Sequence, residues 1–104
     1  MHRKIVIAVF ASLVSLPAAA AEIEVTQADK DFSVREITAS VGDAIVFKNN
    51  DTVAHNVHSS TNGHRFDLGL QAPGGAARLD LPDPGDFTIR CAIHPKMKVN
   101  VSVK

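Results

Sequence analysis

Residues 85–103 read GDFTIRCAIHPKMKVNVSV, and this stretch contains two segments of alternating apolar and polar residues around a short loop. The apolar positions are Phe87, Ile89 and Cys91 before the loop, and Val99, Val101 and Val103 after it. An alternation with a period of two indicates β-strands that have one face on a core and the other in water. The stretch therefore predicts two strands, with the loop that follows Cys91 between them.

The same period of two recurs in the chain upstream of this stretch. It is seen at Ile23 and Val25, at Ile45 and Phe47, at Val53, His55 and Val57, and at Leu79 and Leu81. Turn-forming Gly, Pro, Asn and Asp residues separate these segments. The alternation slips near Arg35 and Glu36, which indicates a bulge or a bend. The pattern predicts an all-β domain of six to eight short strands in an antiparallel sandwich or barrel. From Ser59 to Ala77 the patterning is weak, and we expect a long connection across one end.

The chain has 104 residues, a length that allows one domain. Its first part begins with basic residues at positions 2–4 and continues with an apolar run at 5–16. Pro17 and the alanines at 18–21 follow this run. This is the layout of a secretory signal peptide, and the apolar run is short for a membrane span. We expect residues 1–21 to be a signal peptide and residues 22–104 to be the working domain, exported to the periplasm. A retained N-terminal anchor is the alternative.

Removal of Arg3 and Lys4 with the signal peptide leaves 9 basic and 11 acidic residues, a net charge of −2. Such a domain lacks the basic field that nucleic-acid binding requires. It also lacks a polybasic stretch for anionic lipid. A single Cys cannot form an internal disulfide. Domains of this size often gain stability from a bound metal.

Cys91, His94 and Met97 have the spacing C-x-x-H-x-x-M in the loop between the last two predicted strands. A turn there can aim a thiolate, an imidazole and a thioether at one point. His55 qualifies as a second imidazole, because it lies on the same face as Val53 and Val57. A thiolate with two imidazoles and a weak axial thioether is the ligand set of a type 1 copper site. Zinc sites of this size usually hold more cysteines and no thioether, and an iron–sulfur cluster needs more thiolates.

Each of these residues also has an ordinary interpretation. A lone Cys is most often a small buried hydrophobe, and a lone Met often fills a core. The coincidence of the three residues in one short loop favours the metal site. Of the other histidines, His58 points to the opposite strand face from His55 and is interpreted as solvent-facing. His64 lies in a polar turn and is interpreted as a surface residue. Multicopper oxidase chemistry would need several His-x-His pairs, so we expect no enzyme.

Five motifs together resemble one known family. They are Val41-Gly42-Asp43, Asn49-Asn50-Asp51, His55-Asn56-Val57, Pro84-Gly85 and the segment from Cys91 to Met97. On these motifs, residues 22–104 resemble the small cupredoxins of the amicyanin and plastocyanin type, which are blue copper proteins that shuttle single electrons. The resemblance implies a Greek-key β-sandwich and one copper ion with His55, Cys91, His94 and Met97 as ligands. It also implies that Asn56 ties the two ligand loops together. The chain departs from the family in having Phe87 where an aromatic hydroxyl is common, and in having no Pro soon after Phe32.

The leading functional hypothesis is a soluble, monomeric electron carrier that cycles copper between Cu(II) and Cu(I). Its partners would be transient redox proteins: a dehydrogenase, a c-type cytochrome or an oxidase. We expect the edge of His94 to be the electron port, in an apolar docking patch of Ala92, Ile93 and Pro95 with Ala72 and Pro73. Lys96 and Lys98 would steer an acidic partner. The alternatives are a periplasmic copper-binding carrier or metallochaperone, and a structural sandwich with an incidental Cys.

Overall fold

The computed structural model describes residues 19–104. Most of the predicted signal peptide therefore lies outside the described residues. The described chain forms nine strands: β1 (Glu22–Ala28), β2 (Asp31–Phe32), β3 (Glu36–Ala39), β4 (Ala44–Asn49), β5 (His55–Ser59), β6 (Phe66–Gln71), β7 (Ala76–Asp80), β8 (Gly85–Arg90) and β9 (Lys98–Val103). Within residues 19–104 there is no helix long and apolar enough to cross a membrane.

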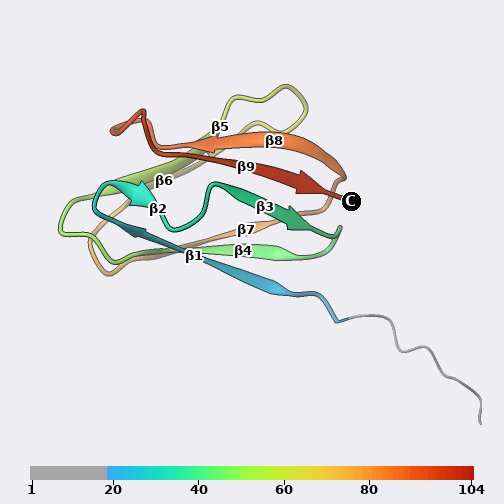
Figure 1. Cartoon of the computed structure of the whole chain (residues 1–104), viewed down its shortest axis with the longest axis horizontal. Coiled ribbons are helices and arrows are strands. Elements are labelled where there is room, and N and C mark those ends of the chain that lie inside the picture. Colours follow the sequence, from blue (N-terminus) through green and yellow to red (C-terminus); the bar gives the residue numbers. More distant parts are fainter. Residues whose placement is uncertain (1–18) are drawn as a thin grey trace, which may run out of the picture.

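The strands form two layers (Figure 1). One sheet has the order β2-β1-β4-β7, and the other has the order β3-β9-β8-β5-β6. The chain changes layer between β2 and β3, β3 and β4, β4 and β5, β6 and β7, and β7 and β8. The prediction of an all-β Greek-key sandwich in one small domain is confirmed.

The prediction of a purely antiparallel arrangement is wrong. β1 runs parallel to β4 from Glu22↔Ala44 to Gln27↔Asn49, and β3 runs parallel to β9. A half-buried strand alternates in the same way whichever direction its neighbour runs, so the alternation could not distinguish the two. The predicted bend at Arg35 and Glu36 is where the chain passes from β2 in one sheet to β3 in the other.

The prediction of a long connection from Ser59 to Ala77 is also wrong, because this stretch contains β6 and the beginning of β7. β6 escaped detection because Gly69 takes a positive φ of 78° and Leu70 is 71% exposed, which breaks the alternation. The pairing of β5 with β6 also shifts register between Asn56 and His58. Val53 precedes β5, so the strand begins at His55 itself.

The core lies between the two layers and is formed by the inward-facing residues of both. Its fully buried members include Val25, Ile45, Phe47, Val57, Ile89 and Val99. Burial of an aliphatic or aromatic side chain of this size contributes about 1.5–3 kcal/mol. His55, Cys91 and Met97 are equally buried, with exposed fractions of 0%, 1% and 0%. The core therefore continues to the end of the sandwich where the candidate ligands lie.

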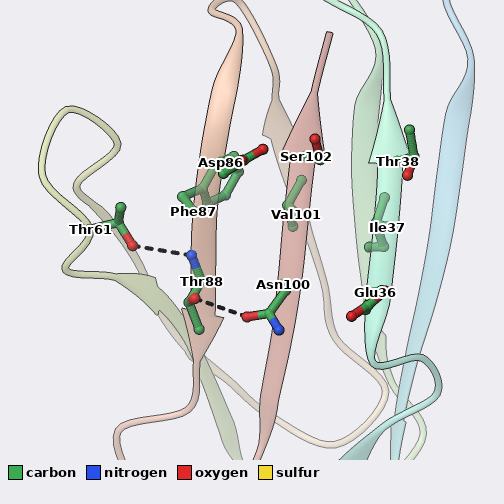
Figure 2. A pocket seen from close by; sticks show the side chains of 10 residues that line it. All are labelled: Glu36, Ile37, Thr38, Thr61, Asp86, Phe87, Thr88, Asn100, Val101 and Ser102. Atoms are coloured by element: carbon green, nitrogen blue, oxygen red, sulfur yellow. Dashed lines mark hydrogen bonds between the residues drawn. The ribbon is translucent and has the colours of Figure 1, made fainter.

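A shallow hollow occupies the outer face of the five-stranded sheet (Figure 2). Thr61, from the connection between β5 and β6, reaches β8 there, and its Oγ1 accepts a hydrogen bond of 3.1 Å from the backbone N–H of Thr88. The Thr88 hydroxyl and Asn100 Oδ1 are 3.0 Å apart. His58 and Arg90 are the one residue pair in the register of β5 and β8. The hydrogen bond from Thr88 to Thr61 is a further contact between β8 and the segment that follows β5.

Candidate metal centre

Three of the four predicted ligands meet at one end of the sandwich. Sγ of Cys91 lies 4.0 Å from Nδ1 of His55 and 3.8 Å from Nδ1 of His94, and the two Nδ1 atoms are 3.2 Å apart. A point in the plane of these atoms lies about 2.1 Å from each of them, which is the length of a metal–nitrogen bond and close to that of a metal–sulfur bond. These donors form the one group of His, Cys and acidic residues in residues 19–104 with metal-binding spacing.

The loop from Cys91 to Met97 is closed by its own backbone. The N–H of Cys91 donates to the carbonyl of Met97 over 3.3 Å, and the N–H of Met97 donates to the carbonyl of His94 over 2.9 Å. β8 delivers Cys91 into this loop, and Met97 leads directly into β9. The fully buried Met97 side chain is therefore held at the base of the loop. Its role as the axial ligand stays a prediction.

The chemistry of the donors fits a copper ion. Nε2 of His55 is engaged by Asp51, which leaves the Nδ1 lone pair of His55 directed at the centre. The backbone N–H of Asn56 donates to Sγ of Cys91 over 3.3 Å, an interaction that suits a thiolate. A soft thiolate with two neutral imidazoles is a donor set that binds copper well in both oxidation states.

Asp51 is the functional residue that sequence reasoning missed. Its Oδ2 lies 2.8 Å from Nε2 of His55 and accepts a second hydrogen bond of 2.8 Å from the backbone N–H of Lys30. Oδ1 accepts one from the N–H of Thr52. The N–H of Lys30, followed by His55 and the N–H of Thr52, lowers the pKa of Asp51 to about 2. Carboxylates that hold a metal-ligating imidazole in this way fix its tautomer and ring orientation.

The loop that carries Asp51 is organised by Asn49, the fully buried last residue of β4. Its Nδ2 donates to the carbonyls of Val53 and Gln71, each over 3.0 Å. Its Oδ1 accepts from the N–H of Asp51 over 3.0 Å. From the sequence, residues 49–51 were interpreted as a turn and as one motif of the family resemblance, without a role for Asp51 at the site. The signal for that role is an Asp four residues before the ligand His.

Asn56 joins the two ligand-bearing segments, as the resemblance implied. Its Oδ1 accepts a hydrogen bond of 3.1 Å from the N–H of Ala92, in the loop after Cys91. Its Nδ2 donates to Oδ1 of Asp67 over 2.9 Å and to the carbonyl of Gly69 over 3.0 Å. Asp67, whose pKa is lowered by the N–H of Gly69 and by Asn56, thereby fixes the orientation of the amide.

The two histidines of the centre differ in exposure. His55 is fully buried on β5, whereas His94 in the loop is half-buried. The predicted patch residues Ala92, Ile93 and Pro95, and also Ala72 and Pro73, are exposed. Leu70, which the sequence reasoning missed, is exposed and pairs with Asn56 across β5 and β6. This end of the molecule therefore presents apolar side chains around a partly accessible imidazole edge.

The other two histidines within residues 19–104, His58 and His64, lie outside the group of ligand atoms. His58 faces outward from β5, as predicted, and is half-buried between its neighbours in the sheet. The interpretation of His64 as a plain surface residue is wrong in detail. Its ring is half-buried and stacks on Phe87, with a centroid separation of 5.0 Å and an interplanar angle of 12°.

Comparison with known proteins adds sequence and fold relatives. Residues 4–103 match the family described as the cupredoxin-like domain. The chain is 37% identical over 93 residues to methylamine utilization protein MauL of Methylorubrum extorquens, an alignment that covers 86% of this chain and 82% of that protein.

Solved structures show the same fold. A Cu(I) structure of an amicyanin variant superposes with a TM-score of 0.74 at 22% identity, over 86% of this chain and 87% of that one. The copper-containing nitrite reductase of Thermus scotoductus superposes with a TM-score of 0.73 at 21% identity. That match covers 80% of this chain but 22% of the reductase, so the likeness concerns one part of the enzyme.

Proposed function

The chain belongs to the cupredoxin-like family, whose cofactor is one type 1 copper ion, and on this premise we propose that it is an electron carrier. In this proposal His55, Cys91 and His94 hold the copper ion and Met97 is its weak axial ligand. The observation that carries the proposal is the convergence of the three donor atoms, 3.2–4.0 Å from one another. Bound there, copper supplies one-electron chemistry through its Cu(II) and Cu(I) states.

The contribution of the protein is to keep the ligands in one geometry in both oxidation states. Asp51 fixes the ring of His55, and the N–H of Asn56 holds the sulfur of Cys91. Asn56 also fastens the loop through Ala92. Ligands that are held in place before the reaction need little rearrangement when charge changes, which lowers the barrier to electron transfer. The fully buried Met97 closes the site from within.

Electrons would leave and enter through the half-buried edge of His94. The exposed apolar residues around it, Ile93 and Leu70 above all, form a small docking patch. Small interfaces suit weak and transient contacts between redox proteins. We propose a dehydrogenase, a c-type cytochrome or an oxidase as partners. The likeness to a methylamine utilization protein supports a place in the electron transfer that accompanies methylamine oxidation.

We further propose that the protein is exported to the periplasm, with residues 1–21 removed as a signal peptide and residues 22–104 kept as the copper domain. The basic start, the apolar run and the alanine-rich end support this. Intact-mass analysis of the protein in the periplasmic fraction tests the proposal. A mass that corresponds to Glu22–Lys104 is the expected result, and a full-length mass in the membrane fraction would contradict it.

The electron-carrier function is tested by repeated reduction and reoxidation of the copper-loaded protein. We expect an intense visible band that ascorbate bleaches and an oxidant restores, with copper retained in each cycle. A Cu(I)-specific chelator distinguishes an electron carrier from the alternative, a copper-binding carrier or metallochaperone. A chaperone would give up its metal to the chelator rapidly, whereas an electron carrier would retain the metal while it exchanged electrons.

A further inference from the structure

Two positive side chains stand opposite each other at the base of the loop 91–97. Arg90 on β8 and Lys98 on β9 are Cα partners in the antiparallel register, and both are exposed. Ile89 and Val99, their neighbours in the strands, are buried, so Arg90 and Lys98 point outward together. Like charges directly opposite in a sheet lie about 5 Å apart at Cβ and destabilise it.

Other strand cations of this protein are paired with carboxylates. Arg78 contacts Glu22 and Asp80, and Lys48 lies 3.1 Å from Glu24. Among the described residues, no carboxylate lies within salt-bridge distance of Arg90 or Lys98. The repulsion between them is therefore left without an internal counter-charge.

The next strand places a histidine beside these two cations. His58 on β5 is the Cα partner of Arg90, and it points outward because Val57 is buried. Beyond it, Asp67 on β6 is the partner of His58, but its carboxylate already accepts hydrogen bonds from Asn56 and Gly69. We call Lys98 and Arg90 the cationic row, and the imidazole of His58 flanks it on β5.

The charges of the whole domain strengthen the contrast. Carboxylates gather at the opposite end of the sandwich, where β1 and β4 begin, β7 ends and β8 begins: Glu22, Asp43, Asp80, Asp83 and Asp86. The metal end has carboxylates too, but Asp31, Asp51 and Asp67 are engaged by Arg35, His55 and Asn56, which leaves the cationic row as an unpaired positive patch there within the described chain. A patch of this kind orients a diffusing acidic protein before contact.

We propose that the cationic row is the docking site for an acidic protein partner, whose carboxylates supply the missing counter-charge. The proposal rests on the proposed function in that this partner is the one that exchanges electrons at His94. Arg90 is adjacent to Cys91 and Lys98 to Met97, so a partner held by the row lies against the ligand loop. Arginine also binds carboxylates through two parallel hydrogen bonds, which adds orientation to attraction.

The surface beside the row is open to such a partner. A hollow of about 380 Å³ lies on β8, β9 and β3, one step further from the loop than Arg90 and Lys98, and Figure 2 shows its lining side chains. Short side chains line its floor, with Thr88 on β8 next to Asn100 on β9.

Poly-L-glutamate is the probe that tests the row. The reduced, copper-loaded protein is titrated with it, and binding is followed by the backbone amide shifts of the ¹⁵N-labelled chain. We expect the shifts to concentrate at residues 88–90 and 98–100 and at His58. Binding should weaken strongly when salt rises from about 20 to about 200 mM. The double variant Arg90→Gln/Lys98→Gln should bind about tenfold more weakly.

The matched control is Arg65→Gln/Lys104→Gln, which removes the same charge from two exposed positions outside the row. It should bind as the wild type does. Thermal melts give a second readout: removal of the Arg90–Lys98 repulsion should raise the melting temperature by about 2–5 °C, and the control should not.

Equal binding by the wild type and Arg90→Gln/Lys98→Gln would overturn the proposal, as would shifts centred elsewhere. A merely solvated face would gain stability in the double variant and lose no binding. The visible copper band and its reversible bleaching are recorded on the same samples. Their failure would contradict the electron-carrier function alone, whereas intact copper chemistry with unchanged binding in the double variant would contradict the row alone.

Discussion

The carboxylate of Asp51 lies 2.8 Å from Nε2 of the fully buried His55, on the side of the ring away from the candidate metal position. The same oxygen accepts the backbone N–H of Lys30. Lys30 and its neighbour Asp29 adopt positive φ angles of 55° and 51° in the tight turn between β1 and β2. This conformation is unfavourable for Lys, and the bond to Asp51 is one interaction that holds it. A surface hairpin is thus connected to the ligand imidazole through one side chain.

The first prediction concerns Asp51→Asn. Loss of the negative charge removes a group that stabilises Cu(II) more than Cu(I), so the reduction potential should rise. A tenfold loss of Cu(II) affinity relative to Cu(I) corresponds to about 59 mV for one electron, and partners of metal-ligating histidines typically change affinity by about 10–100-fold. Cyclic voltammetry measures the shift.

Asp29→Asn is the control for that variant. It removes one negative charge, as Asp51→Asn does, but from an exposed position in the turn between β1 and β2. Asn tolerates the positive φ of this position. Its potential should match that of the wild type. An equal rise of the reduction potential in both variants would show that the effect of Asp51→Asn comes from general surface charge.

The second prediction is the pH dependence of stability in the metal-free protein. The pKa of Asp51 is lowered to about 2 by the N–H of Lys30, by His55 and by the N–H of Thr52. Its contribution to the free energy of unfolding is therefore complete above the ordinary pKa of 3.8. It is lost as the pH falls through about 2. Urea unfolding between pH 5 and pH 2 should show wild-type protein losing stability faster than Asp51→Asn, with the two curves converging. Parallel curves would contradict this.

The third prediction concerns Asn56→Ala. The change leaves the N–H of Ala92 and the carbonyl of Gly69 without this partner, and a typical intramolecular hydrogen bond contributes about 0.5–1.5 kcal/mol. From these two bonds we expect a loss of about 1–3 kcal/mol in the free energy of unfolding, together with weaker Cu(II) binding. Asn62→Ala, at an exposed turn position, should change neither quantity.

Much of the centre could be predicted from the sequence because the loop 91–97 is local. Cys91 and His94 lie three residues apart in one turn, so their spacing alone indicates that their donor atoms can meet. Asp51 was not identified, because it lies four residues before His55 in an irregular loop, and the spacing alone does not show that the two side chains meet. The orientation of its carboxylate also depends on Lys30, 21 residues upstream, which the parallel pairing of β1 with β4 brings beside it. That pairing leaves no mark in the alternation of either strand.

β6 was missed for a related reason. At Gly69 and Leu70 the alternation of buried and exposed residues is interrupted, where the pairing with β5 shifts register beside Asn56. Both residues then contribute to the site, Gly69 through its carbonyl to Asn56 and Leu70 as an exposed apolar side chain near the ligand loop. The local departure from the strand pattern and the support of the centre thus have the same origin.

The fourth prediction concerns Met97→Leu. Leu has nearly the volume of Met, so the fully buried position should remain packed. Loss of the weak axial donor should keep the visible band and raise the reduction potential, since Cu(II) loses more than Cu(I) when a donor is removed. A potential equal to that of the wild type would show that Met97 is a core residue only.

The central claim is that Cys91 binds copper as a thiolate between His55 and His94. The most direct test is the visible absorption spectrum of the purified protein with one equivalent of Cu(II), recorded beside that of Cys91→Ser. The account predicts an intense visible band in the wild type, because this band comes from the bond between sulfur and copper. It predicts that Cys91→Ser has no such band, with a fold that circular dichroism shows to be unchanged. Retention of the band in Cys91→Ser would contradict the account, as would a colourless wild-type protein that binds Cu(II).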